Sequence, residues 1–196
     1  IEELVIQAQN GKDEAFEEIV SLYNKKIYNL ALRILQNSDD ALDVMQDTFL
    51  QAFEKLETFN FKSQFYTWLY RIATNFALMK IRKNKNAPIN ESFMDSRNDF
   101  SFFDSSRSFD FNAEQIAINR ELKIKLDEAV AKLPQIYKTV FILRDIENLS
   151  IKETGEILGI SENNVKIRLK RARMYLKEFL TDVFSEKGAT YELSKN

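Results

Sequence analysis

The chain of 196 residues contains no cysteine and no histidine. Without cysteine it has no disulfide bonds and no metal site built from thiolates. Without histidine it lacks the commonest general base and metal ligand, which argues against a hydrolase, a zinc protein or a redox enzyme. No catalytic residue, metal site or cofactor is expected.

Glycine and proline are also scarce, with 4 and 2 copies. This scarcity argues against a β fold, which needs many turns. Hydrophobic residues make up 44% of the chain, which is enough to build cores. Because Leu, Ile, Lys and Glu recur at helical spacing, the sequence predicts an all-α fold.

No apolar run approaches the roughly 20 residues of a membrane span, and no signal-peptide pattern opens the chain. We expect a soluble, cytoplasmic protein without membrane insertion. The chain starts at Ile1 rather than at a methionine, so we expect that some preceding residues are missing.

The most informative segment is a pair of helices joined by a turn near the end of the chain. Ser150 and Glu153 have the spacing of a capping box that opens the first helix. Gly159 is typical of a left-handed helix end, and Ser161 of an N-cap for the second helix. A buried stripe is predicted on the second helix from Val165, Leu169, Ala172 and Leu176. The pattern indicates a helix-turn-helix, whose second helix suits a DNA major groove.

The exposed side of this second helix is basic. Its cations are Lys166, Arg168, Lys170, Arg171 and Arg173. Arginine and lysine can read guanine edges, Asn163 or Asn164 can pair with adenine, and the remaining cations can contact phosphates. A basic helix is often only a solvated surface, but the helix-turn-helix spacing favours DNA binding.

The net charge of −2 hides a segregation of charge along the chain. Acidic residues dominate 39–57, whereas 80–85 and 166–173 are basic. Acidic and basic surfaces on one molecule are expected of an adaptor between a protein and a nucleic acid.

Residues 1–86 are predicted to form a helical domain with a long helix capped by Asp39 or Asp40. The apolar side of that helix is predicted from Leu42, Met45, Phe49, Ala52, Phe53 and Leu56. Its other side carries Asp43, Gln46, Asp47, Leu50 and Glu54, as a binding surface or a solvated one. A metal is not expected there, because no further carboxylate cluster completes a site.

The next helix, expected over 65–83, changes from aromatic to basic along its length. This composition suits single-stranded DNA, because bases stack on rings while cations follow the backbone. Core packing is the alternative, since Trp68, Ile72 and Phe76 share one face.

Residues 87–113 lose helical periodicity and are predicted to be a flexible linker. The phenylalanines of this linker either pack loosely on a domain or mark an inserted peptide. A second helical domain is predicted over 114–184, with Pro134 at the first position of a helix. The core face of that helix is predicted from Ile136, Val140, Phe141 and Leu143. A tail, 185–196, shows no strong pattern and is expected to fray.

Two parts of the chain resemble bacterial RNA polymerase sigma factors. Residues 40–49 and 63–75 resemble their region 2, and 133–173 resemble their region 4. With these two domains and a short linker, the chain is similar to the extracytoplasmic-function (ECF) subfamily. The resemblance implies a factor that binds core RNA polymerase, recognises the minus-35 and minus-10 promoter elements and promotes DNA melting. It also implies that the protein is not itself an enzyme.

The resemblance also implies three sites. The residues expected to face the clamp helices of the polymerase β′ subunit are Asp43, Gln46, Asp47 and Leu50. Those expected on the melted minus-10 element and its phosphates are Phe61, Lys62, Ser63, Gln64, Trp68, Arg71, Asn75, Lys80, Arg82 and Lys83. Those expected to read the minus-35 element are Ser161, Asn163, Asn164, Lys166, Ile167, Arg168, Lys170 and Arg171.

Further partners implied by the resemblance are the polymerase β flap and an anti-sigma factor. The linker would run through the polymerase, where Asp99, Asp104 and Asp110 would mimic the charge of RNA. Two features depart from the family, which usually has acidic residues where Leu42 and Met79 stand.

The recognition helix departs from the family as well. Asn163 and Asn164 stand where the family favours Gly-Thr, and Ile167 stands where it often has serine. Because these positions would touch base edges or thymine methyl groups, the minus-35 sequence cannot be transferred from the family.

Two other functions fit parts of the sequence. One is an autonomous helix-turn-helix regulator whose N-terminal helices dimerise or sense a ligand. The other is a helical protein-interaction module whose basic helix is incidental.

Overall fold

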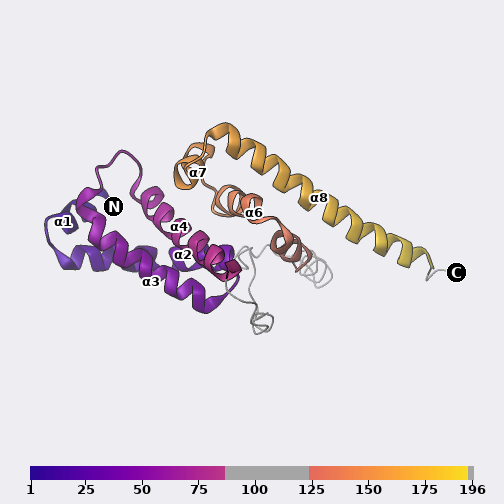
Figure 1. Cartoon of the computed structure of the whole chain (residues 1–196), viewed down its shortest axis with the longest axis horizontal. Coiled ribbons are helices and arrows are strands. Elements are labelled where there is room, and N and C mark those ends of the chain that lie inside the picture. Colours follow the sequence, from indigo (N-terminus) through magenta and orange to yellow (C-terminus); the bar gives the residue numbers. More distant parts are fainter. Residues whose placement is uncertain (87–123, 194–196) are drawn as a thin grey trace, which may run out of the picture. The chain divides into compact units, whose positions relative to one another are not determined.

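The computed structural model describes residues 1–86 and 124–193 (Figure 1). The regular elements in these two ranges are helices, so the all-α prediction is confirmed. The predicted linker, 87–113, lies outside the described residues. The described residues group into two compact units, one holding 1–86 with Lys152–Ser161 and the other holding 124–151 with 162–193.

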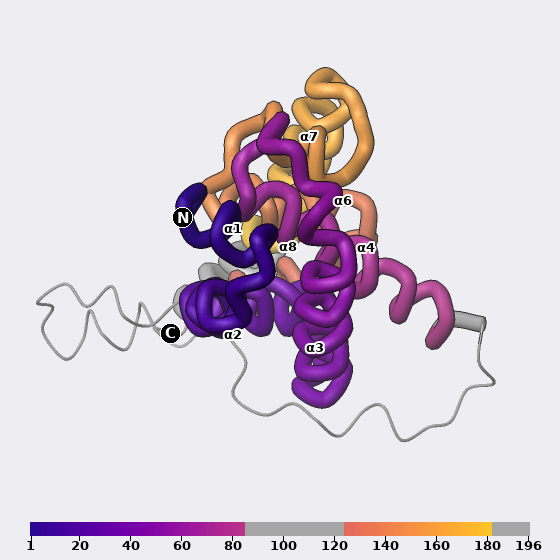
Figure 2. Tube along the Cα trace, turned by 90° about the vertical axis from the view of Figure 1, so that its left-hand side faces the viewer, coloured from indigo at the N-terminus to yellow at the C-terminus, as the bar shows by residue number. Residues whose placement is uncertain are grey.

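The first unit opens with two helices. α1 (Glu2–Gln9) and α2 (Asp13–Leu35) pack against each other and are joined by a turn in which Gly11 has φ of 82° (Figure 2). Only glycine adopts this backbone conformation without strain. The inner face of α2 includes Ile19, Ile27, Leu30, Ala31 and Ile34, all of which are buried.

α3 (Ser38–Lys55) begins earlier than predicted. The side-chain oxygen of Asn37 accepts a hydrogen bond from the backbone N–H of Asp40 at 2.8 Å, so Asn37 is the N-cap. The prediction that Asp39 or Asp40 caps this helix is therefore wrong. Both carboxylates lie in the first turn instead, where their negative charge interacts favourably with the positive end of the helix dipole.

The buried face of α3 also differs from the prediction. It consists of Ala41, Val44, Thr48, Phe49 and Ala52. Leu42 and Phe53 are 45% and 56% exposed, so assigning them to the core face was wrong. Each residue turns the helix by about 100°, so a face centred on the small Ala41 and Thr48 leaves Leu42 outside. Phe53 instead packs edge-on against Phe16 of α2, with ring centroids 5.0 Å apart.

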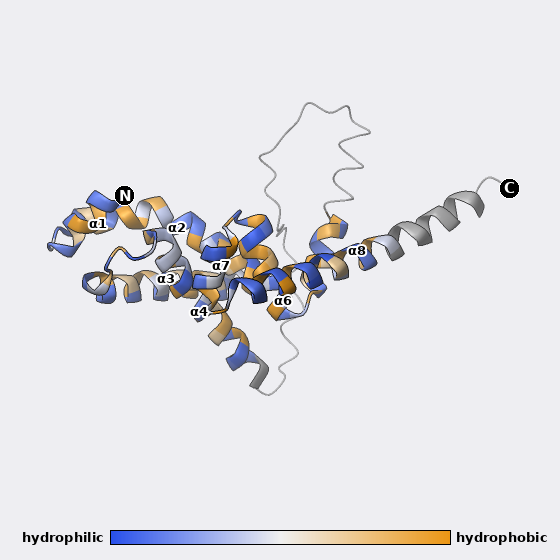
Figure 3. Cartoon of the chain, turned by 90° about the horizontal axis from the view of Figure 1, so that it is seen from above, coloured by the Kyte–Doolittle hydropathy of each residue, from blue (hydrophilic) through white to orange (hydrophobic). Residues whose placement is uncertain are grey.

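A short connection links α3 to the last helix of the bundle. The 3-10 helix η1 (Leu56–Thr58) follows α3, and Gln9 of α1 holds this connection in place. The Gln9 amide donates to the carbonyl oxygens of Leu56 and Phe59, at 2.9 and 2.8 Å. α4 (Phe65–Asn86) then packs on α2 and α3 (Figure 1). Hydrophobic and hydrophilic residues both occur along the described part of α4 (Figure 3).

The second unit begins, within the described residues, with a helix that ends at Lys132. α6 (Gln135–Phe141) follows, with Pro134 as its N-cap at ψ of 137°. The prediction of Pro134 at the first helical position is therefore wrong by one residue, because its ψ is extended rather than helical. A π-helical turn, η3 (Ile142–Ile146), continues α6, and the N–H of Glu147 closes this turn on the carbonyl of Ile142 at 2.9 Å.

Most of the predicted core face of α6 is confirmed. Val140, Phe141 and Leu143 are buried, but Ile136 is 53% exposed and was wrongly assigned to the core. Ile136 lies in the first turn of α6, whereas burial begins at Lys138.

The last two helices match the predicted helix-turn-helix boundaries. α7 (Ile151–Leu158) is followed by Gly159 with φ of 64°, and α8 (Glu162–Leu193) begins after Ser161. Fraying of the tail from 185 stays a prediction, and α8 continues to Leu193. Extending an existing helix adds one hydrogen bond per residue fixed, and this segment contains no proline to stop it.

No helix in the described ranges is long and apolar enough to cross a membrane. In the same residues, no group of three or more acidic side chains is placed to hold a metal ion.

Candidate polymerase and nucleic-acid interfaces

One side of α3 forms an exposed surface of acidic and apolar side chains, which we call the α3 surface. It consists of Asp43, Gln46, Asp47 and Leu50, all exposed. Leu50 is 64% exposed, and Leu42 lies exposed beside this row. A partner with apolar and basic groups would bury the exposed leucine and pair with the carboxylates beside it.

The structure connects the α3 surface to α4 through Lys80. The ammonium nitrogen of Lys80 lies 2.7 Å from Asp43 Oδ2 and 2.9 Å from Asp40 Oδ1. Asn84 also donates to Asp40, at 3.4 Å. Burial lowers the pKa of Lys80, but its hydrogen bonds to Asp43 and Asp40 outweigh burial and raise the pKa overall. Lys80, expected on DNA phosphates, is therefore paired with the surface expected to bind polymerase.

A cluster of aromatic rings shapes the segment before α4. Phe59 is buried, and its ring centroid lies 4.9 Å from Phe61, 5.5 Å from Phe65 and 5.3 Å from Trp68. Phe61 is 41% exposed and has φ of 58°, a conformation that a bulky residue rarely adopts. The cluster therefore holds the Phe61 ring at the surface at a cost in backbone strain.

The position of Trp68 is compatible with both interpretations of α4, core packing and binding of single-stranded DNA. It is half-buried and packs on Phe59 and Phe65, with centroids 5.3 and 5.5 Å apart, while part of it remains accessible. Arg71 and Asn75 follow on the same stripe of α4 and are exposed. The remaining minus-10 candidates are also accessible: Lys62, Gln64, Arg82 and Lys83 are exposed and Ser63 is half-buried.

The first turns of α8 present the expected recognition surface. Its exposed members are Asn163, Asn164, Lys166, Ile167, Lys170 and Arg171, preceded by the exposed Ser161. Ile167 is 43% exposed, and Arg168 is half-buried. The predicted stripe of Val165, Leu169, Ala172 and Leu176 is buried.

Two arginines of the basic cluster have partners that sequence reasoning missed. Arg171 Nη1 donates to the hydroxyl of Tyr137 in α6 at 3.0 Å. Arg173 donates to both carboxylate oxygens of Asp145 in η3, at 2.8 and 3.0 Å. The hydrogen bond from Arg173 to Asp145 raises the pKa of that guanidinium. These pairs are 34 and 28 residues apart, so helical periodicity carries no signal of them.

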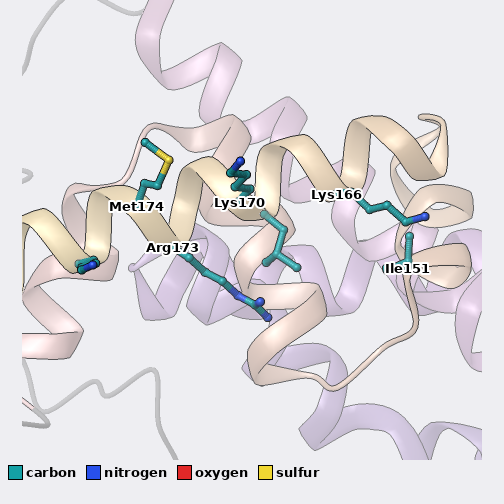
Figure 4. Close-up of a pocket in the computed structure, with 7 residues that line it drawn as sticks. Ile151, Lys166, Lys170, Arg173 and Met174 are labelled. Atoms are coloured by element: carbon teal, nitrogen blue, oxygen red, sulfur yellow. The ribbon is translucent and has the colours of Figure 1, made fainter.

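An open groove of about 520 Å³ runs along α8 (Figure 4). Its apolar residues are Ile151, Leu169 and Met174, and its cations are Lys166, Lys170, Arg173 and Lys177. Lys166 and Lys170 thus border both this groove and the exposed recognition surface.

Comparison with known proteins supports the assignment of both domains. Residues 19–87 match Sigma-70 region 2, and residues 123–176 match Sigma-70, region 4. The chain is 34% identical to the ECF RNA polymerase sigma factor SigW of Bacillus subtilis, over 93% of the chain and 98% of that protein. It is 33% identical to the ECF RNA polymerase sigma-E factor of Haemophilus influenzae, over 87% of the chain and 89% of that protein.

Solved structures show the same fold. CnrH, solved in complex with the cytosolic domain of CnrY, aligns with a TM-score of 0.64 and 24% identity over 91% of this chain and 96% of that one. The sigma factor RpoE, solved with the anti-sigma factor NepR from Bartonella quintana, aligns with a TM-score of 0.62 and 20% identity. That match covers 85% of this chain and 96% of RpoE.

The matches to both regions, in chain order and over most of the chain, define a bacterial transcription initiation factor. The chain belongs to the ECF RNA polymerase sigma factors.

Proposed function

We propose that this sigma factor binds core RNA polymerase through the α3 surface and promoter DNA through α4 and α8. The main support is the separation of exposed side chains by chemistry: carboxylates with Leu50 on α3, aromatic and cationic groups on α4, and amides and cations on α8. A protein that bridges a polymerase and DNA needs surfaces of opposite charge.

The β′ clamp helices are the proposed partner of Asp43, Gln46, Asp47 and Leu50. An exposed leucine gives an apolar anchor, and the surrounding carboxylates orient a basic partner. A contact with the β flap through the second unit is part of the same proposal.

Melting of the minus-10 element follows from differential binding. Phe61 and Trp68 offer aromatic surface on which an unstacked base gains contacts that a paired base cannot make. Lys62, Gln64, Arg71 and Asn75 would bind the opened strand, and Arg82 and Lys83 nearby phosphates. Binding of the open form offsets the few kcal/mol needed to unstack a base.

The minus-35 element is the proposed target of α8. Asn163, Asn164 and Ile167 stand where base edges would be read, with Ile167 suited to a thymine methyl group. Lys166, Lys170 and Arg171 supply charge, while the half-buried Arg168 is less accessible.

The domain limits and cellular context are part of the proposal. We assign 1–86 to region 2, 87–113 to the linker and 114–184 to region 4; the family matches cover 19–87 and 123–176. An anti-sigma factor is a further proposed partner, since sigma factors of this fold have been solved with such proteins. A factor that works on polymerase and chromosomal DNA acts in the cytoplasm.

Run-off transcription tests the proposal. Core polymerase, this chain and genomic fragments are expected to give discrete transcripts that neither protein gives alone. No transcript from any fragment contradicts the proposal. A footprint on a palindrome without polymerase would instead indicate an autonomous regulator. Absence of salt-dependent DNA binding would indicate a protein-interaction module.

A further inference from the structure

Tyr137 of α6 and Arg171 of α8 form a hydrogen bond at the protein surface. Arg171 is exposed on α8, and its guanidinium donates to the Tyr137 hydroxyl at 3.0 Å. The Tyr137 ring is stacked on the ring of Tyr175, with centroids 5.7 Å apart and planes at 29°. The stacking fixes the position of the Tyr137 ring, and thereby that of its hydroxyl, at the surface beside Arg171.

The chemistry of this hydrogen bond leaves both partners able to bind an anion. A guanidinium can only donate, so the Tyr137 oxygen must accept and its own proton remains available. Arg171 has five N–H donors, of which the bond to Tyr137 uses one. A phenol that accepts from a cation is polarised and becomes a stronger donor. The phenol proton and the remaining guanidinium protons thus form one cluster of donors with a positive charge.

The position of this cluster on α8 indicates which anion it meets. Asn164, Ile167 and Arg171 follow one another at three- and four-residue steps, so they lie on one stripe. Arg171 lies about 10 Å along the helix from Asn164. In a recognition helix the N-terminal residues contact base edges, so donors at the far end of the stripe meet the DNA backbone.

We propose that Tyr137 and Arg171 form a joint binding site for one phosphate group of the minus-35 DNA backbone. This inference rests on the proposed function. It adds an α6 residue, Tyr137, to the DNA contacts and makes Arg171 a phosphate ligand rather than a reader of bases.

The test uses the holoenzyme, made from core polymerase and the full chain, on a promoter fragment identified by run-off transcription. Tyr137→Phe keeps the ring and removes the hydroxyl, and it is expected to weaken promoter binding about three- to tenfold. Tyr175→Phe removes the neighbouring hydroxyl as a matched control and is expected to bind like the wild type. Equal thermal stability of the two variants separates a lost contact from a lost fold.

A double-mutant cycle tests whether the two residues share one phosphate. In an Arg171→Ala background, Tyr137→Phe is expected to change the affinity less than twofold. Arg171→Ala itself is expected to reduce the slope of log K against log salt by about one. Both changes should weaken binding equally on promoters with altered minus-35 bases, because phosphates carry no sequence information.

Several results would overturn the inference while leaving the proposed function intact. They are wild-type binding by Tyr137→Phe, full additivity of the two changes, or a loss that depends on one base pair. Failure of the wild-type holoenzyme to bind any promoter would instead contradict the proposed function itself.

Discussion

Lys80 of α4 forms an ion pair with Asp43 of α3, with Nζ 2.7 Å from Oδ2. Asp40 Oδ1 lies 2.9 Å from the same ammonium group. A residue expected to neutralise DNA phosphates is thus neutralised by the surface expected to bind polymerase.

The first prediction concerns the stability of this ion pair. Lys80→Ala is expected to lower the free energy of unfolding by at most about 1 kcal/mol, because the Asp43 side chain is 62% exposed and solvent screens the pair. Lys83→Ala, on an exposed neighbour, serves as the control and is expected to have no effect. Urea unfolding measures both, and a loss from Lys80→Ala no larger than the control's would contradict a stabilising pair.

The pH dependence of the same pair has a definite sign. The pKa of Lys80 is raised above its ordinary value of 10.5, so the folded state holds this proton more tightly than the unfolded state. The stabilisation is fully present below 10.5 and is lost as pH rises through the folded-state pKa. Unfolding of the wild type and Lys80→Ala should therefore converge at strongly alkaline pH. A difference that persists or grows there would contradict this assignment.

The second prediction tests the cap of α3. Asn37→Ala removes the acceptor of the Asp40 N–H and is expected to cost about 1 kcal/mol of unfolding free energy. Ser38→Ala, at the next position, is expected to change it by less than about 0.5 kcal/mol. Thermal or urea unfolding distinguishes them. An equal loss of unfolding free energy in both variants would contradict Asn37 as the N-cap of α3.

The third prediction compares two buried threonines. Thr48 donates to the carbonyl of Val44 at 2.6 Å, whereas the hydroxyl oxygen of Thr74 is buried without a hydrogen-bond partner among the described residues. Thr48→Val is expected to cost about 0.5–1.5 kcal/mol, because it removes a hydrogen bond. Thr74→Val removes only an unsatisfied group and should be neutral or stabilising. A larger loss for Thr74→Val than for Thr48→Val would reverse this ranking.

The fourth prediction concerns Lys170 in the recognition surface. Lys170→Ala is expected to weaken promoter binding by the holoenzyme by about 1–3 kcal/mol if Lys170 reads a base, with the loss confined to one minus-35 position. If it contacts phosphate, binding weakens on all sequences and the salt slope falls by about one. Lys177→Ala, about 10 Å further along α8, is the control. Unchanged binding after Lys170→Ala would remove Lys170 from the interface.

Local signals in the sequence were sufficient to predict the helix-turn-helix. A capping spacing at Ser150, a turn at Gly159 and a helical apolar stripe each depend on residues a few positions apart. The same reasoning misplaced Leu42 and Phe53, because small residues such as Ala41 and Thr48 let the helices approach on a different face. Burial depends on which side a neighbour covers, and hydrophobicity within one helix does not determine that side.

The contacts that relate the candidate sites to one another could not be predicted. Lys80 and Asp43 are 37 residues apart in sequence, and Arg171 and Tyr137 are 34 apart. Each pair joins two helices whose packing register follows from the whole core. Charge patterning predicted that Asp43 and Arg171 belong to charged surfaces, but only the fold shows which side chains they meet.

The central claim is that the α3 surface binds core polymerase, and the most direct test is the affinity of core polymerase for a charge-reversed variant. Asp43→Lys with Asp47→Lys should abolish binding while circular dichroism and unfolding show an intact fold. Glu17→Lys with Glu18→Lys makes the same charge change on exposed positions of α2 and should bind like the wild type. Normal binding by the α3 variant, or equal loss in both variants, would contradict the account.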